Sequence, residues 1–336
     1  MTGINMLSAY DIIGDNTFRE RIGLDFEDFA PGQRFRHRPG VTLSQQDNAD
    51  EALETLNAAM LHYDAHYAAA TTWRRPLMVS TLVLQRIVGM TAKTYGNRTS
   101  ILGFPEIALT APVFGGDTLY AESEVLDCGT SSGTGTVTAR LCALKSDGAE
   151  IGRITARFAI RNRTDTRRAN ELRFAAYRAD AEGTLIEQTG LFFEDLQQGD
   201  HFLHTPRRGF PPAAVFAHAT RALELSPHHH ADDRLTVPET FVIAQATAAT
   251  TRSFGRVVAN LGWHDIELPR PVFAGDTIEV DSHIQETRLS RSRPTEGIVS
   301  ITTEARNQHG DTVLRYRRNL LVYRGGGATH YARAGY

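Results

Sequence analysis

The hydrophobic positions of the chain form two similar series, each beginning with an apolar segment of helical length. Residues 82–95 are apolar on most faces of a helix, follow Ser80 and Thr81, and are ended by Gly96. Hydroxyl side chains before an apolar run and a glycine after it are typical of helix ends. This pattern predicts a buried helix, and residues 240–254 predict its counterpart in the second series.

Segments with alternating β-branched and polar residues follow each predicted helix. They cover residues 119–125, 135–144 and 151–160 in the first series, and residues 278–284, 298–305 and 312–323 in the second. Alternation with a period of two predicts half-buried strands, and Gly-containing turns separate them. A buried helix followed by an antiparallel meander is typical of an α+β fold in which a sheet wraps around a helix.

The two series are copies of one unit. Leu-Asp-Phe-Glu-Asp-Phe at residues 24–29 recurs as Leu-Phe-Phe-Glu-Asp-Leu at residues 191–196, an offset of 191 − 24 = 167 positions. Pro-Val-Phe-Gly-Gly-Asp-Thr at residues 112–118 recurs, with one change, at residues 271–277, an offset of 271 − 112 = 159. Two collinear blocks at nearly constant offset indicate an internal duplication, with 167 − 159 = 8 residues lost from the second copy.

This duplication predicts five segments. They are an N-terminal lead-in (1–24), a first domain (25–162), a polar, Arg-rich linker (163–190), a second domain (191–325) and a flexible Gly-rich tail (326–336).

Composition excludes several classes of function. The 36 Lys and Arg residues nearly balance 39 Asp and Glu residues, so no basic surface for nucleic acid is expected. No apolar run is long enough to span a bilayer, and residues 1–21 contain no apolar core of a signal peptide. Cys128 and Cys142 form neither a disulfide framework nor a metal-binding spacing. These features favour a cytoplasmic protein without a metal and without a nucleic-acid or membrane partner.

Three sequence motifs resemble one known group of proteins. They are Phe-Glu-Asp-Phe near the start of the first copy, Pro-Val-Phe-x-Gly-Asp-Thr before both meanders, and Leu-Asn-Ala-Ala-Met-Leu-His-Tyr-Asp at residues 56–64. Together they resemble the MaoC-like hydratase/dehydratase group of the hotdog superfamily, over roughly residues 24–325. The fused arrangement is similar to the mesaconyl-CoA hydratase type. The resemblance implies a double hotdog fold and an acyl-thioester hydratase or dehydratase.

The resemblance also implies a catalytic pair in the first copy. The group has an acidic residue five positions before a histidine, and here these positions are Asn57 and His62. The usual Asn-Pro between them is replaced by Ala59 and Met60. His62 is then the acid/base, because histidine titrates near neutral pH and can both take and return a proton. Asn57 cannot act as a base, but its amide can hold the water or fix the imidazole.

Hydration of an unsaturated thioester also needs hydrogen-bond donors for the enolate oxygen. Backbone N–H groups at Ser80 or Thr81, at the start of the predicted helix, are the candidates, since helix starts carry unsatisfied donors and a partial positive charge. The related group has His-Gly where this chain has Val79 and Ser80.

Two further residues are candidates for substrate contacts. Asp64 is the nearest possible second proton carrier to His62, although it also suits the cap of a helix over residues 65–71. Arg75 is a candidate partner for a second carboxylate on the acyl group, and Arg74 and Arg86 are alternatives.

The second copy contains a rival pair. Glu224 and His229 keep the five-residue spacing and restore a carboxylate. The eight missing residues fall directly after His229, in the expected wall of the acyl pocket, which favours the first copy.

Two other clusters invite functional interpretation. His228, His229 and His230 suggest zinc, but consecutive histidines point apart, so a solvated loop is favoured. Arg288, Arg291 and Arg293 suit either coenzyme A phosphates or a solvated turn, and the turn is favoured.

Two alternative functions stay open because a fold hosts many activities. One is an acyl-CoA-binding protein without catalysis, and the other is a hotdog thioesterase. No cofactor is expected beyond the coenzyme A or carrier pantetheine of the substrate. A fused pair supplies both halves of a hotdog dimer, so a monomer or a homodimer of fused chains is compatible with the sequence.

Overall fold

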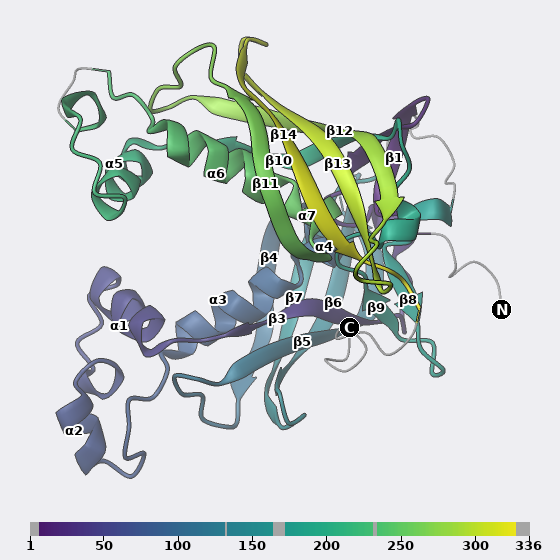
Figure 1. Ribbon diagram of the computed structural model, residues 1–336. Coiled ribbons are helices and arrows are strands. Elements are labelled where there is room, and N and C mark those ends of the chain that lie inside the picture. Colours follow the sequence, from purple (N-terminus) through teal and green to yellow (C-terminus); the bar gives the residue numbers. More distant parts are fainter. Residues whose placement is uncertain (1–6, 132, 164–171, 231–233, 327–336) are drawn as a thin grey trace. The chain divides into compact units, whose positions relative to one another are not determined.

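The structure, a computed structural model, describes residues 7–131, 133–163, 172–230 and 234–326. These residues form two compact units, each with a seven-stranded sheet around a helix (Figure 1). This arrangement confirms the expected α+β double hotdog. The expected flexible tail lies outside the described residues except for Gly326.

The first unit contains the first copy of the meander. Its strands, in sheet order, are β4 (Arg98–Leu109), β7 (Glu150–Ile160), β6 (Thr134–Lys145), β5 (Thr118–Ser131), β3 (Arg34–Thr42), β9 (Leu185–Glu187) and β8 (Tyr177–Ala179). Its helices and 3-10 turns are η1 (Phe26–Asp28), α1 (Gln45–Glu54), η2 (Met60–His62), α2 (Ala65–Ala70), α3 (Ser80–Met90) and α4 (Ala92–Tyr95). Helix α3 contacts β3, β5 and β6.

The second unit repeats this arrangement. Its strands, in the matching order, are β11 (Val257–Glu267), β14 (Thr312–Tyr323), β13 (Glu296–Asn307), β12 (Thr277–Leu289), β10 (His201–Gly209), β2 (Thr17–Glu20) and β1 (Tyr10–Gly14). Its helices and 3-10 turns are η3 (Leu172–Phe174), η4 (Phe193–Asp195), α5 (Pro212–Arg221), η5 (Pro227–His229), α6 (Glu239–Ala249) and α7 (Thr251–Phe254). Helix α6 contacts β10, β12 and β13.

The central helix differs in two ways from the sequence-based prediction. It is interrupted at Thr91, so that α3 and α4 replace one continuous helix, and its N-cap is Val79 rather than Ser80 or Thr81. Leu82, Val83, Ile87 and Val88 are buried, and Leu84 and Met90 are half-buried. Apart from Ser80 at the first position, the exposed residues Thr81, Gln85 and Gly89 are four apart and form one narrow stripe, so the helix is covered on most sides, as the sequence predicts.

The predicted lead-in and the predicted linker both contain strands of the sheets. Strand β2 pairs in parallel with β10 of the second unit, and β9 pairs in parallel with β3 of the first. The two β hairpins are themselves copies, because Glu20 and Glu187 stand 187 − 20 = 167 positions apart, the offset of the main repeat. Each repeat therefore starts with a hairpin that completes the sheet formed by the other repeat. The described part of 163–190 is thus not a linker.

Each hairpin brings a glutamate to a buried histidine. In the first unit, His37 Nδ1 lies 2.8 Å from Glu187 Oε1, and His37 Nε2 lies 2.8 Å from Ser123 Oγ. Glu187 also accepts hydrogen bonds from the Arg38 backbone N–H and from Thr94 Oγ1. His37 and Glu187 are almost completely buried, so this network fixes where the hairpin docks.

The second unit has the same network. His204 Nδ1 lies 2.9 Å from Glu20 Oε1, and His204 Nε2 lies 3.0 Å from Ser282 Oγ. Glu20 also accepts hydrogen bonds from the Thr205 backbone N–H and from Ser253 Oγ. Because every polar atom of the buried carboxylate has a donor, the charge is tolerated in the core.

This network predicts that acid weakens the second unit. Burial works to raise the pKa of Glu20, but the hydrogen bond and charge of His204 outweigh it and hold the pKa below its ordinary value. A lowered folded-state pKa stabilises the fold above the unfolded pKa of about 4.3, and this stability is lost as pH falls through the folded value. Urea unfolding followed by Trp263 fluorescence in a Trp73→Phe background should show this decline below about pH 4.3. Glu20→Gln should show a shallower decline, and equal slopes for both proteins would contradict the assignment.

The described residues bear on two expectations from the sequence, one about the cysteines and one about membrane-spanning helices. Cys128 and Cys142 are both free thiols. None of the helices in the described ranges combines the length and apolar character needed to cross a bilayer.

Candidate functional site

His62 lies at the end of the short turn η2 of the first unit. Its Nδ1 atom is 2.7 Å from the carbonyl oxygen of Leu77. A carbonyl oxygen can only accept, so Nδ1 carries the proton of the neutral ring and Nε2 carries the lone pair. The ring is partly exposed. Nε2 is therefore the basic atom of a histidine that solvent can reach.

The buried side chain of Asn48, on α1, holds the His62 turn against the start of α3. Asn48 Nδ2 donates to the carbonyl oxygens of His62 (2.7 Å) and Leu77 (3.0 Å). Asn48 Oδ1 accepts the backbone N–H of Val79 at 2.7 Å. One amide thus fixes both the segment that carries the histidine and the segment that orients its ring.

Asn48 was not singled out by the sequence analysis, and the second copy shows why it matters. With the offset of 167, its counterpart is Val215, which packs in the hydrophobic core of the second unit. The polar brace is therefore specific to the first copy. A motif search does not find Asn48. A position-by-position comparison of the two repeats would have found it, because Val215 stands at the equivalent position.

The second copy forms a similar turn around His229. His229 Nδ1 is 2.7 Å from the carbonyl oxygen of Thr236, but the residue is only 2% exposed. Glu224 accepts hydrogen bonds from the Ser226 hydroxyl and backbone N–H, and these, more than the nearby His229, lower the pKa of Glu224. Ser226 and Pro227 cap and begin η5, where the first copy has Ala59 and Met60.

The structure gives Asn57 and Asp64 local hydrogen bonds. Asn57 Oδ1 accepts the backbone N–H of Ala59 at 3.0 Å, and among the described residues no hydrogen bond joins Asn57 to His62. The ring is instead oriented by Leu77. Asp64 accepts the backbone N–H of Tyr67 at 2.9 Å and caps α2, which confirms the structural interpretation of this residue.

A small apolar cavity lies at the start of α3. Its volume is about 230 Å³, and its lining includes Trp73, Leu77, Met78, Ser80 and Pro112. Leu77 therefore forms part of the cavity wall, and its carbonyl oxygen orients the His62 ring. The first backbone N–H groups of a helix have no intrahelical acceptor, so those of Ser80 and Thr81 are available at this end. The Thr81 hydroxyl itself donates to Glu51.

Arg75 packs its guanidinium over the Phe114 ring, 3.9 Å from the ring centroid. In the second copy Arg234 packs over Phe273 at 3.5 Å. Because the contact recurs in both repeats, it belongs to the repeated fold, and the substrate role of Arg75 stays a prediction.

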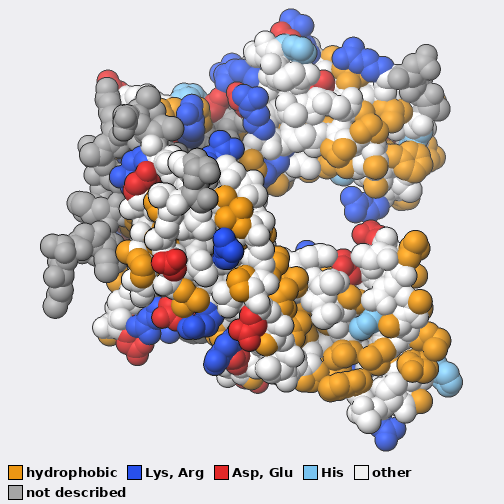
Figure 2. Space-filling view, turned by 180° about the vertical axis from the view of Figure 1, so that it is seen from behind, with side chains coloured by type: hydrophobic (Ala, Val, Ile, Leu, Met, Phe, Trp, Pro, Cys, Tyr) orange, Lys and Arg blue, Asp and Glu red, His pale blue; other side chains and the backbone are white. Residues whose placement is uncertain are grey.

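Large apolar side chains are exposed around the His62 turn. The exposed residues of this region are Leu53, Leu56, Met60, Tyr63, Tyr67 and Trp73. Figure 2 shows the hydrophobic side chains gathered over this part of the first unit, at the lower right of the view. The histidine turn is therefore set in apolar surface.

The other two clusters have local partners. His229 and His230 bond to different carbonyl oxygens, those of Thr236 and Glu224, so their ring nitrogens do not converge. Arg288 lies near the end of β12, where it is exposed and 3.9 Å from Glu286, and Arg291 and Arg293 lie in the turn that follows.

Comparison with known proteins agrees with this architecture. The family described as "MaoC like domain" matches residues 26–145, and the family described as "Mesaconyl-CoA hydratase" matches residues 162–330. A mesaconyl-CoA hydratase of Haloarcula hispanica is 42% identical over 65 residues, 19% of this chain and 18% of that protein. A mesaconyl-CoA hydratase of Cereibacter sphaeroides is 30% identical over 150 residues, 40% of this chain and 41% of that protein. The matched regions span less than half of either relative.

A solved structure from Mycobacterium tuberculosis, described as a double hotdog fold, covers 90% of this chain and 99% of its own. It is 21% identical, with a TM-score of 0.40. The match to residues 162–330 spans half of the 336-residue chain. The chain therefore belongs to the mesaconyl-CoA hydratase family.

Proposed function

We propose that this protein is a hydro-lyase that adds water to, or removes it from, the 2,3-position of an acyl thioester, with His62 as its acid/base. The observation that carries the proposal is the hydrogen bond from His62 Nδ1–H to Leu77, because it leaves Nε2 basic in a partly exposed turn. Relatives in the family are named for mesaconyl-CoA and β-methylmalyl-CoA, which makes short branched CoA esters the first candidates.

The proposed reaction uses one histidine twice. His62 Nε2 takes a proton from water as the water oxygen bonds to the β-carbon, and the α,β double bond becomes an enolate. The Ser80 and Thr81 backbone N–H groups then stabilise the enolate oxygen, as donors at a helix start do. The imidazolium returns its proton to the α-carbon, and dehydration follows the same steps in reverse. Asn57 Oδ1 is taken by the Ala59 backbone N–H, but the Asn57 NH₂ group is suited to donate to the water.

The cavity supports a short acyl group. Its volume of about 230 Å³ is below the range of roughly 300–1,000 Å³ that drug-sized ligands occupy. Its walls are mainly apolar, and the surrounding surface of the first unit is apolar as well.

A rival position for the same chemistry is the second copy. The observation in its favour is that Glu224 and His229 keep the family spacing in an equivalent turn, where hydrogen bonds from Ser226, and to a smaller extent the charge of His229, lower the pKa of Glu224. Against it stand the burial of His229 and the loss of the amide brace at Val215.

An absorbance assay tests the proposed function. Mesaconyl-CoA and crotonyl-CoA lose their conjugated enoyl absorbance on hydration, and a thiol reagent in a parallel assay detects hydrolysis. We expect loss of the enoyl absorbance without release of free thiol. Release of thiol in step with substrate loss would identify a thioesterase, and saturable binding of both esters without turnover would identify a binding protein.

Asn48→Val introduces the residue that the second copy has at this position. It should remove the three hydrogen bonds by which the Asn48 amide holds the His62 turn. The buried N–H of Val79 then loses its acceptor, which costs roughly 1–3 kcal/mol of stability. Displacement of the histidine turn should lower kcat by up to about 100-fold with little change in KM. Gln46→Ala, an exposed position on the same helix, is the control. Wild-type kcat in Asn48→Val would show that the brace does not position the site.

A further inference from the structure

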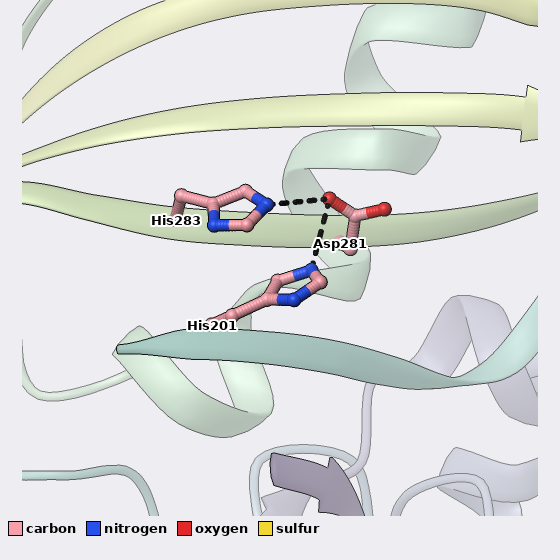
Figure 3. A group of neighbouring side chains, drawn as sticks. All are labelled: His201, Asp281 and His283. Carbon is pink, nitrogen blue, oxygen red and sulfur yellow. Dashed lines mark ion pairs between the residues drawn. The ribbon is translucent and has the colours of Figure 1, made fainter. Parts of the chain in front are cut away.

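Three metal-ligating side chains gather on one face of the second sheet, outside the site described above. His201 on β10 pairs in register with His283 on β12, and Asp281 is two positions before His283, on the same face. Figure 3 shows one Asp281 oxygen directed at both imidazole rings. His201 Nε2 is 3.3 Å from Asp281 Oδ1, and His283 Nε2 is 3.9 Å from the same oxygen.

Two of these atoms, His201 Nε2 and Asp281 Oδ1, are shielded from solvent. They meet each other in an ion pair at 3.3 Å, but neither forms a hydrogen bond of good geometry among the described residues. Buried polar atoms are rarely left without a hydrogen bond, and a bound ion is one of the ways in which such atoms are satisfied. The other carboxylate oxygen, Asp281 Oδ2, is held by Arg306 at 2.5 Å, so Oδ1 stays directed at the rings.

The two imidazole rings lie side by side on neighbouring strands. They stack with centroids 3.7 Å apart and an interplanar angle of 13°.

The first repeat shows that the fold does not require this cluster. At the positions of His201, Asp281 and His283 it has Arg34, Glu122 and Glu124. There the acidic residues form ordinary ion pairs, such as Arg36 with Glu122 at 2.9 Å. The two histidines around one carboxylate are therefore a feature of the second repeat alone.

We propose that His201, Asp281 and His283 bind a divalent transition-metal ion of the zinc class. The three ligand atoms lie within 4.8 Å of one another. Tetrahedral zinc with bonds of about 2.0–2.2 Å requires ligand separations of roughly 3.3–3.6 Å. The 3.3 Å separation of His201 Nε2 and Asp281 Oδ1 already meets this requirement. The His283 ring is exposed, so it can move closer to these two atoms when the ion binds. Arg306 acts as the outer-shell partner that orients the carboxylate.

The site would take imidazole nitrogens and one carboxylate oxygen, a set that suits Zn²⁺, Co²⁺ and Ni²⁺ and is unsuited to Mg²⁺ or Ca²⁺. Three protein ligands leave one coordination position for water. The ion would join β10 to β12. It would therefore strengthen the part of the sheet to which the β1–β2 hairpin adds through β10.

The test is a zinc titration of tag-free, chelator-treated protein against a metallochromic competitor. We expect one tightly bound ion per chain, a raised unfolding temperature with Zn²⁺, and a Co²⁺ spectrum of tetrahedral type. His283→Ala removes an exposed ligand, so it should fold normally and weaken binding at least tenfold, and His201→Ala should do the same.

His228→Ala is the matched control, since it removes an exposed histidine from the run of three. It should bind Zn²⁺ like the wild type. The proposal is overturned if the wild type binds no stoichiometric ion, if His283→Ala keeps wild-type affinity, or if only His228→Ala loses the ion.

Discussion

Replacing His62 with alanine is expected to lower kcat/KM for hydration of the enoyl thioester by about 10²- to 10⁴-fold, the usual contribution of one positioned acid/base. The reason is the geometry of the ring, whose Nδ1–H is held by Leu77 so that Nε2 is left to accept the proton of water. KM should change little, because the imidazole acts on water and on the α-carbon rather than on the thioester body. The measurement is the initial rate of loss of enoyl absorbance.

His229→Ala is the matched control for this experiment, because it removes the equivalent ring from the equivalent turn of the second copy. It should keep kcat/KM within a fewfold of the wild type. If His229→Ala lost activity while His62→Ala kept it, the catalytic centre would have to be assigned to the second copy.

The second large effect is expected on stability, from removing a hairpin glutamate. Glu187→Ala leaves His37, the Thr94 hydroxyl and the Arg38 backbone N–H without their shared buried acceptor. Breaking a buried, hydrogen-bonded pair by removing one partner typically costs 3–5 kcal/mol. We therefore expect a fall of about this size in the free energy of unfolding of the first unit.

The two tryptophans make this measurable unit by unit, since Trp73 lies in the first unit and Trp263 in the second. Urea unfolding of Glu187→Ala is followed through Trp73 in a Trp263→Phe background, and Glu20→Ala is followed through Trp263 in the reverse background. The control is Glu182→Ala, an exposed glutamate on the same hairpin, which should change stability by less than about 0.5 kcal/mol. If Glu187→Ala were no worse than Glu182→Ala, the buried pair would not anchor the hairpin.

The sequence predicted the parts of the fold that depend on long, periodic apolar segments. The meander strands matched well; residues 135–144, for instance, lie within β6 (Thr134–Lys145). The exchanged hairpins were not predicted, because strands such as β9 (Leu185–Glu187) are too short to show periodicity. The equal offset of Glu20 and Glu187 was present in the sequence, but a single repeated residue gives little signal before its histidine partner is known.

The candidate site shows the same division. His62 was found because its spacing from Asn57 resembles a family motif, whereas Asn48 looks like any polar residue of a surface helix. Its importance depends on its complete burial and its three short hydrogen bonds, which only the fold reveals. His201 and His283 could not be paired from spacing, because their proximity arises from the register of β10 with β12.

The exchange of hairpins between the repeats imposes an order on protein synthesis. Glu20 leaves the ribosome 184 residues ahead of His204, which corresponds to roughly ten to forty seconds at typical translation rates. In the same way, Glu187 is synthesised 150 residues after His37 of β3. Until then, one edge of β3 is unpaired and His37 lacks its carboxylate partner. The sheet of the first repeat therefore stays incomplete until β9, at the start of the second repeat, has been synthesised. Chaperone engagement and translational pausing near residue 190 should therefore influence the yield of folded protein.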